Sequence, residues 1–198
     1  LSLGLDDRQT FIDCETKPTV LGSHQQSVEE LALWFDWLKE KGHSEFILFG
    51  HSRGGAQASL FYKTHRPAGL QKLVLIAPAV HDQQYVTKQY ETRYSRKLQP
   101  MIDHFRSMEN QTDALTDAPV LYCTFTTVSA EAFLSYYTET PQKHTPKLIS
   151  DIDIPTLVFL GSEDALSHRL IKYENEFSTN LNVSTYWVEG ADHFFRDL

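Results

Sequence analysis

Apolar and polar residues form two kinds of pattern along the chain: short apolar segments with the length of a strand, and longer stretches with helical spacing. The continuous runs, which have the length of buried strands, are residues 46–49, 73–77 and 154–161; residues 183–188 are a further strand pattern, which alternates around Tyr186 and Trp187. The stretches with apolar residues three and four apart are residues 27–42 and 53–65. Strands that alternate with helices in this way predict an α/β fold, with a mostly parallel central sheet and helices on both faces.

The first of these helices has sequence signals at both ends. Ser27, with Glu30 three residues later, matches the pattern of a capping box, so we expect the helix to begin there. Gly42 predicts its end. The side chains expected to face the sheet are Leu31, Trp34, Phe35 and Leu38.

The motif Gly50-His51-Ser52-Arg53-Gly54 stands between the first apolar run and the second helix. A strand, G-x-S-x-G and a helix are the parts of a nucleophile elbow, in which a sharp turn lifts the serine hydroxyl clear of the sheet. We expect Gly50 and Gly54 to keep side chains from clashing across that turn. The alternatives are an ordinary glycine-rich turn and a phosphate-binding loop. The phosphate loop is disfavoured because neither G-x-x-x-x-G-K-[ST] nor G-x-G-x-x-G is present.

Two later strands end in residues that could complete a catalytic site. The run 154–161 is followed by Ser162-Glu163-Asp164, and the run 183–188 by Glu189-Gly190-Ala191-Asp192-His193. With the elbow and the run Pro155–Gly161, these segments resemble the α/β-hydrolase family, whose catalytic residues follow the order serine, acid, histidine. The resemblance implies that the chain has the α/β-hydrolase fold and acts as a serine hydrolase.

The resemblance assigns a role to each residue of the expected site. Ser52 would be the nucleophile, His193 the general base and Asp164 the acid that orients the imidazole. The backbone N–H of Arg53 would be one donor to the oxyanion, and the elbow itself comprises Gly50, His51 and Gly54. Other acids compete with Asp164: we rank Asp82 second and Glu163 third, while Asp192, adjacent to His193 on an extended segment, should point the other way.

The expected reaction is hydrolysis of a carboxylic ester, a small-molecule substrate, through an acyl-enzyme intermediate. The same three residues also serve thioesterases, acyltransferases, peptidases and C–C hydrolases. A non-catalytic, hydrolase-like binding module is the alternative from another class. The sequence does not reveal the substrate.

Residues 82–148 break the alternation of strands and helices. Gln84–Met108 and Val128–Tyr137 have helical patterns, and the first is rich in tyrosine. In the family a helical cap is commonly inserted at this place, and long insertions in a compact domain are usually functional. We therefore expect one α/β-hydrolase domain over residues 1–198, with residues 82–148 as a lid. The alternative is that these helices merely cover the edge of the sheet.

Composition excludes several other classes. A chain of 198 residues with 41% hydrophobic and 22% charged residues is typical of a soluble globular protein. A net charge of −8 argues against nucleic-acid binding. No apolar run approaches the ~20 residues of a membrane span, so no membrane insertion is expected. No metal or cofactor is expected either, because neither H-E-x-x-H nor a Cys/His cluster is present.

Two free thiols are favoured for Cys14 and Cys123, although one bridge is not excluded. Oligomeric state and compartment stay open, with the cytoplasm favoured.

The chain also lacks parts that the family usually has. Residues 1–5 alternate like the end of a strand, and in the family a further strand lies between this one and residues 46–49. The second oxyanion donor usually comes from the loop after that further strand, and a last helix usually follows the histidine. We therefore expect the sequence to be part of a longer protein whose preceding residues supply the missing strand, because a gap would leave backbone groups unpaired.

Overall fold

The computed structural model describes residues 19–20, 22–110 and 115–196, and the chain divides into two compact units. The first unit contains Asp82–Glu139 and the described residues up to Ser27. The second contains Val28–His81 and the described residues from Thr140 onward. The strand expected at residues 1–5 lies outside the described residues, and so does Cys14. The expected insertion of residues 82–148 overlaps most of the first unit, and its role as a lid stays a prediction.

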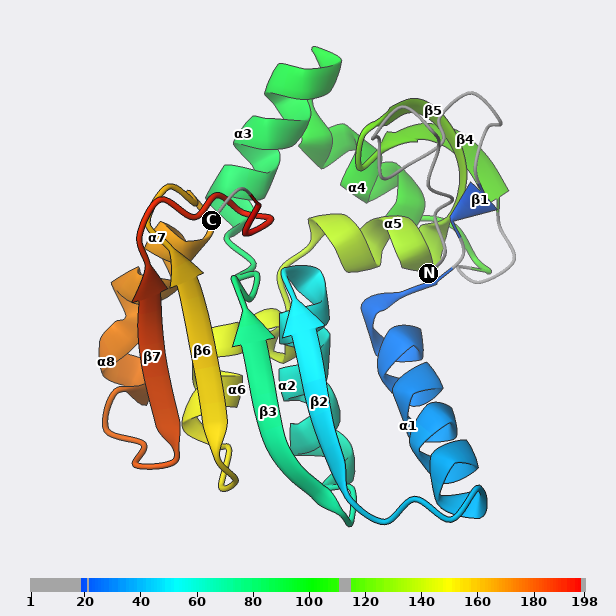
Figure 1. The fold of residues 1–198 in the computed structure, drawn as a ribbon. Helices are drawn as coiled ribbons and strands as arrows, with labels where there is room; N and C mark the ends of the chain where they lie inside the picture. Colours follow the sequence, from blue (N-terminus) through cyan, green and yellow to red (C-terminus); the bar gives the residue numbers. More distant parts are fainter. Residues whose placement is uncertain (1–18, 21, 111–114, 197–198) are drawn as a thin grey trace. The chain divides into compact units, whose positions relative to one another are not determined.

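The second unit is built on a parallel sheet of four strands in the order β2-β3-β6-β7 (Figure 1). The predicted α/β architecture with a parallel sheet is confirmed. The strands are β2 (Phe46–His51), β3 (Leu70–Ile76), β6 (Thr156–Gly161) and β7 (Val183–Val188). The helices are α1 (His24–Glu40), whose residues up to Ser27 belong to the first unit, α2 (Arg53–His65), η1 (Pro141–Lys143), α6 (Thr145–Ser150), α7 (Ser167–Leu170), η2 (Ile171–Tyr173) and α8 (Glu174–Phe177).

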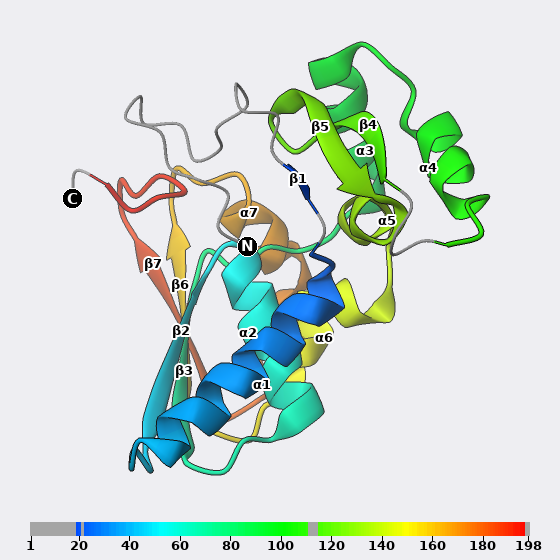
Figure 2. The ribbon, with the colours of Figure 1, turned by 90° about the vertical axis from the view of Figure 1, so that its right-hand side faces the viewer.

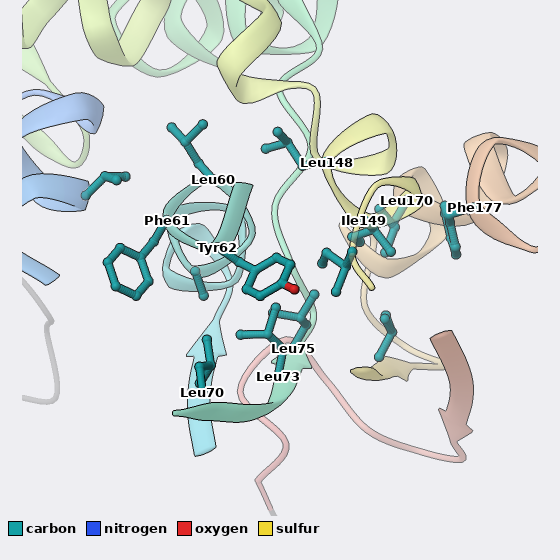
Figure 3. Close-up of a cluster of buried hydrophobic side chains, with 14 of the residues drawn as sticks. Leu60, Phe61, Tyr62, Leu70, Leu73, Leu75, Leu148, Ile149, Leu170 and Phe177 are labelled. Atoms are coloured by element: carbon teal, nitrogen blue, oxygen red, sulfur yellow. The ribbon is translucent and has the colours of Figure 1, made fainter. Parts of the chain in front are cut away.

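The main hydrophobic core lies between this sheet and the helices α2 and α6 (Figures 2 and 3). Leu73 and Leu75 of β3 point to the same side of the sheet and are fully buried. Phe61 of α2 and Ile149 of α6 meet them in this core and are also fully buried. Each such side chain contributes roughly 1.5–3 kcal/mol by leaving water. The core therefore fixes α2 against the sheet, with its first residue at the end of β2.

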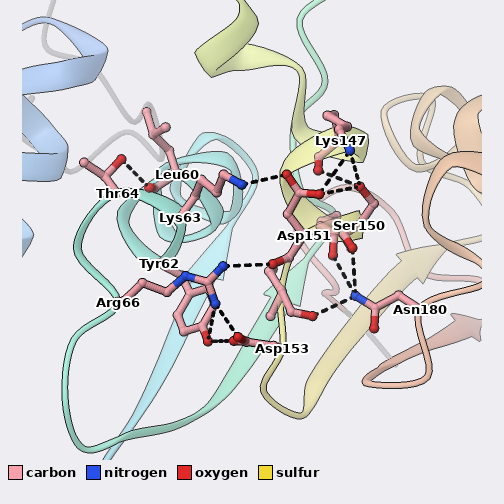
Figure 4. A network of polar contacts seen from close by, with 12 residues as sticks. Leu60, Tyr62, Lys63, Thr64, Arg66, Lys147, Ser150, Asp151, Asp153 and Asn180 are labelled. Atoms are coloured by element: carbon pink, nitrogen blue, oxygen red, sulfur yellow. Dashed lines mark hydrogen bonds and ion pairs between the residues drawn. The ribbon is translucent and has the colours of Figure 1, made fainter.

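A polar network holds the other end of α2 (Figure 4). Lys63 pairs with Asp151 at 2.8 Å, and Arg66 pairs with Asp153. The two ion pairs join the C-terminal end of α2 to the segment between α6 and β6. The amide of Asn180 holds the start of the same segment, because it donates to the carbonyls of Ile149 and Ser150 at the end of α6 and of Ile152 just after it.

The helix α1 differs from its prediction at its start and on one face. It begins at His24, because Ser23 and Gln26 form the capping box: the Gln26 N–H donates to Ser23 Oγ at 3.1 Å, and the Ser23 N–H donates to Gln26 Oε1 at 2.8 Å. The prediction of a cap at Ser27 is therefore wrong. Phe35 is buried as expected, but Trp34 is 61% exposed.

The strand β2 is an edge strand among the described residues. Phe46 and Leu48 pack toward the core, while Ile47 and Phe49 alternate to the opposite face and are 55% and 65% exposed. The strand expected to precede it in the sheet stays a prediction, since it lies outside the described residues.

The first unit is only partly helical, which corrects the sequence prediction. The expected long helix is divided at Ser95, which adopts a left-handed conformation with φ 51°. The beginning of the second expected helix is a strand that forms an antiparallel hairpin with the strand before it. Residues 124–128, Thr-Phe-Thr-Thr-Val, are all β-branched or aromatic, which favours a strand. The elements are β1 (Thr19–Val20), α3 (Gln83–Tyr94), α4 (Leu98–Arg106), β4 (Leu115–Val120), β5 (Cys123–Ser129) and α5 (Ala130–Tyr137), and the sheet order is β1-β5-β4.

Tyrosines of this unit hold the tip of the hairpin. Leu121 has a positive φ of 58°, a strained conformation for a leucine. Its N–H donates to the hydroxyl of Tyr137 at 2.7 Å, and its carbonyl accepts from the hydroxyl of Tyr94 at 2.7 Å. These two bonds hold the backbone of Leu121 from both sides. Burial raises the pKa of the neighbouring Tyr90 to about 12. Cys123 on β5 is not a free thiol, so the preference for two free thiols is wrong for this residue.

Candidate active site

Ser52 occupies a strained turn between β2 and α2. Its φ of 55° and ψ of −121° lie outside the backbone regions that residues other than glycine normally adopt. Four backbone bonds hold the turn. The Ser52 N–H donates to the carbonyl of Ile76 at 2.8 Å. The Ser52 carbonyl accepts from the N–H groups of Ala79 at 2.9 Å, Gly55 at 3.0 Å and Ala56 at 3.4 Å. The geometry is that of an elbow in which the surrounding structure fixes the serine.

The glycines of the motif do not share one function. A β-carbon at Gly50 would lie 2.5 Å from the carbonyl oxygen of Gly54, so no side chain fits there. A β-carbon at Gly54 would meet nothing within 4 Å, and the expectation that Gly54 prevents a clash is wrong. The crowded position after the serine is Gly55, where a β-carbon would lie 2.8 Å from Pro78.

The fold brings Ser52, His193 and Asp164 together at the carboxyl ends of the strands. The Oγ of Ser52 lies 2.9 Å from Nε2 of His193, within hydrogen-bond reach. The other ring nitrogen, Nδ1, lies 3.2 Å from Oδ2 of Asp164. A carboxylate at this distance favours a hydrogen on Nδ1, which leaves the lone pair of Nε2 toward the serine hydroxyl. The charge of Asp164 therefore favours the tautomer in which Nε2 can accept a proton.

Asp164 is buried in a set of donors at the end of β6. Its side chain is 3% exposed. Oδ1 accepts from the N–H of Leu166 at 3.0 Å, and Oδ2 accepts from the N–H and hydroxyl of Ser167 at 3.0 Å and 2.7 Å. Burial alone would raise the pKa of Asp164, but the bonds from Leu166, Ser167 and His193 outweigh it and lower the pKa below its ordinary value. The carboxylate therefore stays ionised.

The three competing acids have other environments. Asp82 caps α3 by accepting from the N–H of Tyr85 at 2.9 Å. Glu163 is exposed. Asp192 accepts from the N–H of Phe194 at 2.8 Å and pairs with Arg196 at 3.0 Å. The geometry thus favours Asp164, as the sequence ranking did.

A close backbone approach places the loop that carries His193. A β-carbon at Gly161, the last residue of β6, would lie 2.4 Å from the carbonyl oxygen of Ala191 and 3.0 Å from that of Asp192. The N–H of Glu163 donates to the same Ala191 oxygen at 3.0 Å. Because residue 161 has no side chain, the loop can lie directly on the end of β6.

Two residues of the site were not recognised from the sequence. Ser167 is fully buried and bridges the site: its hydroxyl donates to Asp164 and accepts from the N–H of Gly161 at 3.0 Å. Its position three residues after Asp164, in the loop that follows a predicted strand, was the signal that could have found it. His51, expected only to pack beside the elbow, has a ring nitrogen 2.7 Å from the carbonyl oxygen of His193. The two residues are 142 positions apart, and no local sequence pattern predicts a contact between them.

The described residues contain no group of three or more His, Cys, Asp or Glu that could hold a metal ion. In the part of the chain that the structure describes, no helix is long and apolar enough to cross a membrane.

The parallel sheet, with a strained serine turn between β2 and α2, has the architecture of the α/β-hydrolase fold. Residues 15–193 match the family described as serine aminopeptidase, S33, and the chain belongs to that family.

Solved structures share this fold at low sequence identity. Est1E from Butyrivibrio proteoclasticus is 16% identical, with a TM-score of 0.58 over 88% of this chain and 64% of its own. A monoacylglycerol lipase from Paleococcus ferrophilus is 15% identical, with a TM-score of 0.56 over 88% of this chain and 68% of its own. A structure from a study of carboxylesterases of Nitrososphaera gargenis is 18% identical, with a TM-score of 0.53 over 87% of this chain and 65% of its own. The chain thus spans about two thirds of their lengths.

One curated relative matches a shorter segment. A protein of Oryza sativa subsp. japonica named probable 1-acylglycerol-3-phosphate O-acyltransferase is 38% identical over 74 residues. The match covers 32% of this chain and 18% of the rice protein.

Proposed function

We propose that this protein is a serine hydrolase that cleaves carboxylic esters through an acyl-enzyme intermediate. The observation that carries the proposal is the continuous chain of contacts from Ser52 through His193 to Asp164. A serine hydroxyl is a weak nucleophile, and a base fixed in the correct tautomer by a buried carboxylate activates it.

In the proposed reaction Ser52 Oγ attacks the ester carbonyl, and Nε2 of His193 takes the proton of the Ser52 hydroxyl. The tetrahedral oxyanion accepts a hydrogen bond from the backbone N–H of Arg53, the first residue of α2, where the helix dipole favours negative charge. His193 then gives the proton to the departing alcohol, which leaves an acyl group on Ser52. In the second half a water attacks the acyl group, His193 takes its proton, and Ser52 recovers the proton as the acid departs.

Esters are proposed as the substrate class because the structural neighbours include proteins named as carboxylesterase and monoacylglycerol lipase. The family description names an aminopeptidase, and the rice relative is named as an acyltransferase. All three activities share the acyl-enzyme step. They differ in the bond that is cleaved and in whether water or an alcohol accepts the acyl group.

The test uses the full-length protein and its Ser52→Ala variant. A fluorophosphonate probe should label the wild type and leave the variant unlabelled, and p-nitrophenyl esters of graded chain length should be hydrolysed only by the wild type. Loss of the nucleophile can lower turnover on the order of 10⁶-fold. Aminoacyl p-nitroanilides, and an acyl donor with a lysophospholipid acceptor, test the peptidase and transferase alternatives in parallel. Labelling and ester hydrolysis that persist in Ser52→Ala would refute the proposal.

A further inference from the structure

The ring of His51 contacts the backbone of the residue that carries the proposed base. Nε2 of His51 lies 2.7 Å from the carbonyl oxygen of His193, and the two rings are 4.9 Å apart. Because a carbonyl oxygen only accepts hydrogen bonds, Nε2 of His51 must carry the hydrogen and donate it.

The position of His51 in β2 explains this contact. Alternation along the strand puts His51 on the same face as Ile47 and Phe49, the face opposite the main core. The next residue, Ser52, turns away into the elbow. One strand end therefore carries two groups, the proposed nucleophile and a donor that reaches the loop of His193.

Other contacts hold this loop on either side of His193. Before it, the N–H of Gly190 donates to Ser162 Oγ at 2.8 Å, and the carbonyl of Ala191 accepts from Glu163. After it, the Phe194 N–H donates to the carboxylate of Asp192. The bonds of Gly190 and Ala191 join the loop to the residues that follow β6, and the bond between Phe194 and Asp192 is internal to the loop. His51 differs from both because it joins the loop to the elbow.

We propose that His51 is a positioning residue, whose Nε2–H holds the backbone of His193 at the distance from Ser52 that proton transfer requires. The inference rests on the proposed function of Ser52 and His193. Because Ser52 directly follows His51, the last residue of β2, a movement of the end of β2 carries the nucleophile and the anchor of the base together. The 2.9 Å separation between Ser52 Oγ and His193 Nε2 is thereby maintained.

Three substitutions at this exposed position separate the donor from the ring. His51→Gln keeps an amide nitrogen at a reach similar to Nε2 of histidine and should restore the bond. His51→Asn keeps the amide but is too short to reach the carbonyl. His51→Phe keeps a ring beside His193 and Phe194 but has no donor. We expect the Asn and Phe variants to lose roughly tenfold in kcat at unchanged KM, and the Gln variant to stay within about threefold of wild type.

The measurements are steady-state hydrolysis of p-nitrophenyl acetate, the second-order rate of fluorophosphonate labelling of Ser52, and the urea midpoint of unfolding. A labelling rate that falls with kcat in the Asn and Phe variants, at an unchanged urea midpoint, supports the proposal. Wild-type activity in His51→Phe would overturn it. An equal loss in all three variants, or a loss that follows a lower urea midpoint, would also overturn it. Failure of the proposed function is distinct, because the wild type itself would then be neither labelled nor active.

Discussion

A methyl group added at Gly161 should impair catalysis far more than folding. The β-carbon of Gly161→Ala would lie 2.4 Å from the carbonyl oxygen of Ala191, a backbone atom that cannot rotate away as a flexible side chain would. Carbon and oxygen atoms in ordinary contact are about 3.5 Å apart, so the loop must retreat by about 1 Å. His193 follows Ala191 by two residues and moves with it.

The size of the effect follows from that displacement. A 1 Å misplacement of a catalytic group can cost on the order of 10²-fold in rate, so we expect kcat to fall about a hundredfold. Crowding of a well-packed position typically costs about 1–3 kcal/mol of unfolding free energy. That leaves a domain of ordinary stability folded.

Gly54→Ala is the matched control. It makes the same chemical change two residues after Ser52, but its β-carbon would meet nothing within 4 Å. It should keep activity and gain about 0.4–1 kcal/mol of stability, since alanine loses less entropy than glycine in a helix. The assays are p-nitrophenyl acetate hydrolysis and urea unfolding of both variants. Gly161→Ala with activity within about threefold of wild type, or an equal loss in Gly54→Ala, would refute the argument.

Three further predictions concern the buried acid. Asp164→Asn should lower turnover by roughly 10⁴-fold because the amide favours the wrong imidazole tautomer, while Asp82→Asn should keep its turnover; the reverse result would move the acid to Asp82. The lowered pKa of Asp164 means that its ionised form stabilises the fold above about pH 4 and that this contribution is lost as the pH falls through the folded-state pKa. The difference in unfolding free energy between wild type and Asp164→Asn should therefore shrink on acidification, and a constant difference would contradict this. Ser167→Ala should cost about 1–3 kcal/mol in urea unfolding, because the buried N–H of Gly161 loses its acceptor; an unchanged midpoint would argue against the bridging role.

The neighbourhood of Ser52 could be predicted from the sequence because its determinants are local. Four apolar residues, a glycine-rich turn and a helical pattern adjoin one another, and α2 spans Arg53–His65 as predicted. The order of serine, acid and histidine after three strands also implied where they meet, since parallel strands present their carboxyl ends at one edge of the sheet.

Some predictions depended on which distant residues pack against a side chain or pair with a strand, and several of these were wrong. Trp34 fits the apolar spacing of α1 but is exposed, because spacing alone does not decide which face of a helix is covered. Gly54 fits the motif, yet the clash that glycine avoids occurs at Gly50 and Gly55. The last two residues of β5, Val128 and Ser129, were predicted as helix because their pairing partner β4 could not be recognised in advance.

By itself, the sequence determined the parallel α/β architecture, the elbow, and the identity of the serine and histidine expected to act. Only the tertiary structure decided which carboxylate faces His193, that Ser167 supports it, and that His51 donates to the His193 backbone. The physical reason is that patterning and turn chemistry act over a few neighbouring residues. Hydrogen bonds between the ends of different strands depend on distances that arise only after the sheet has assembled.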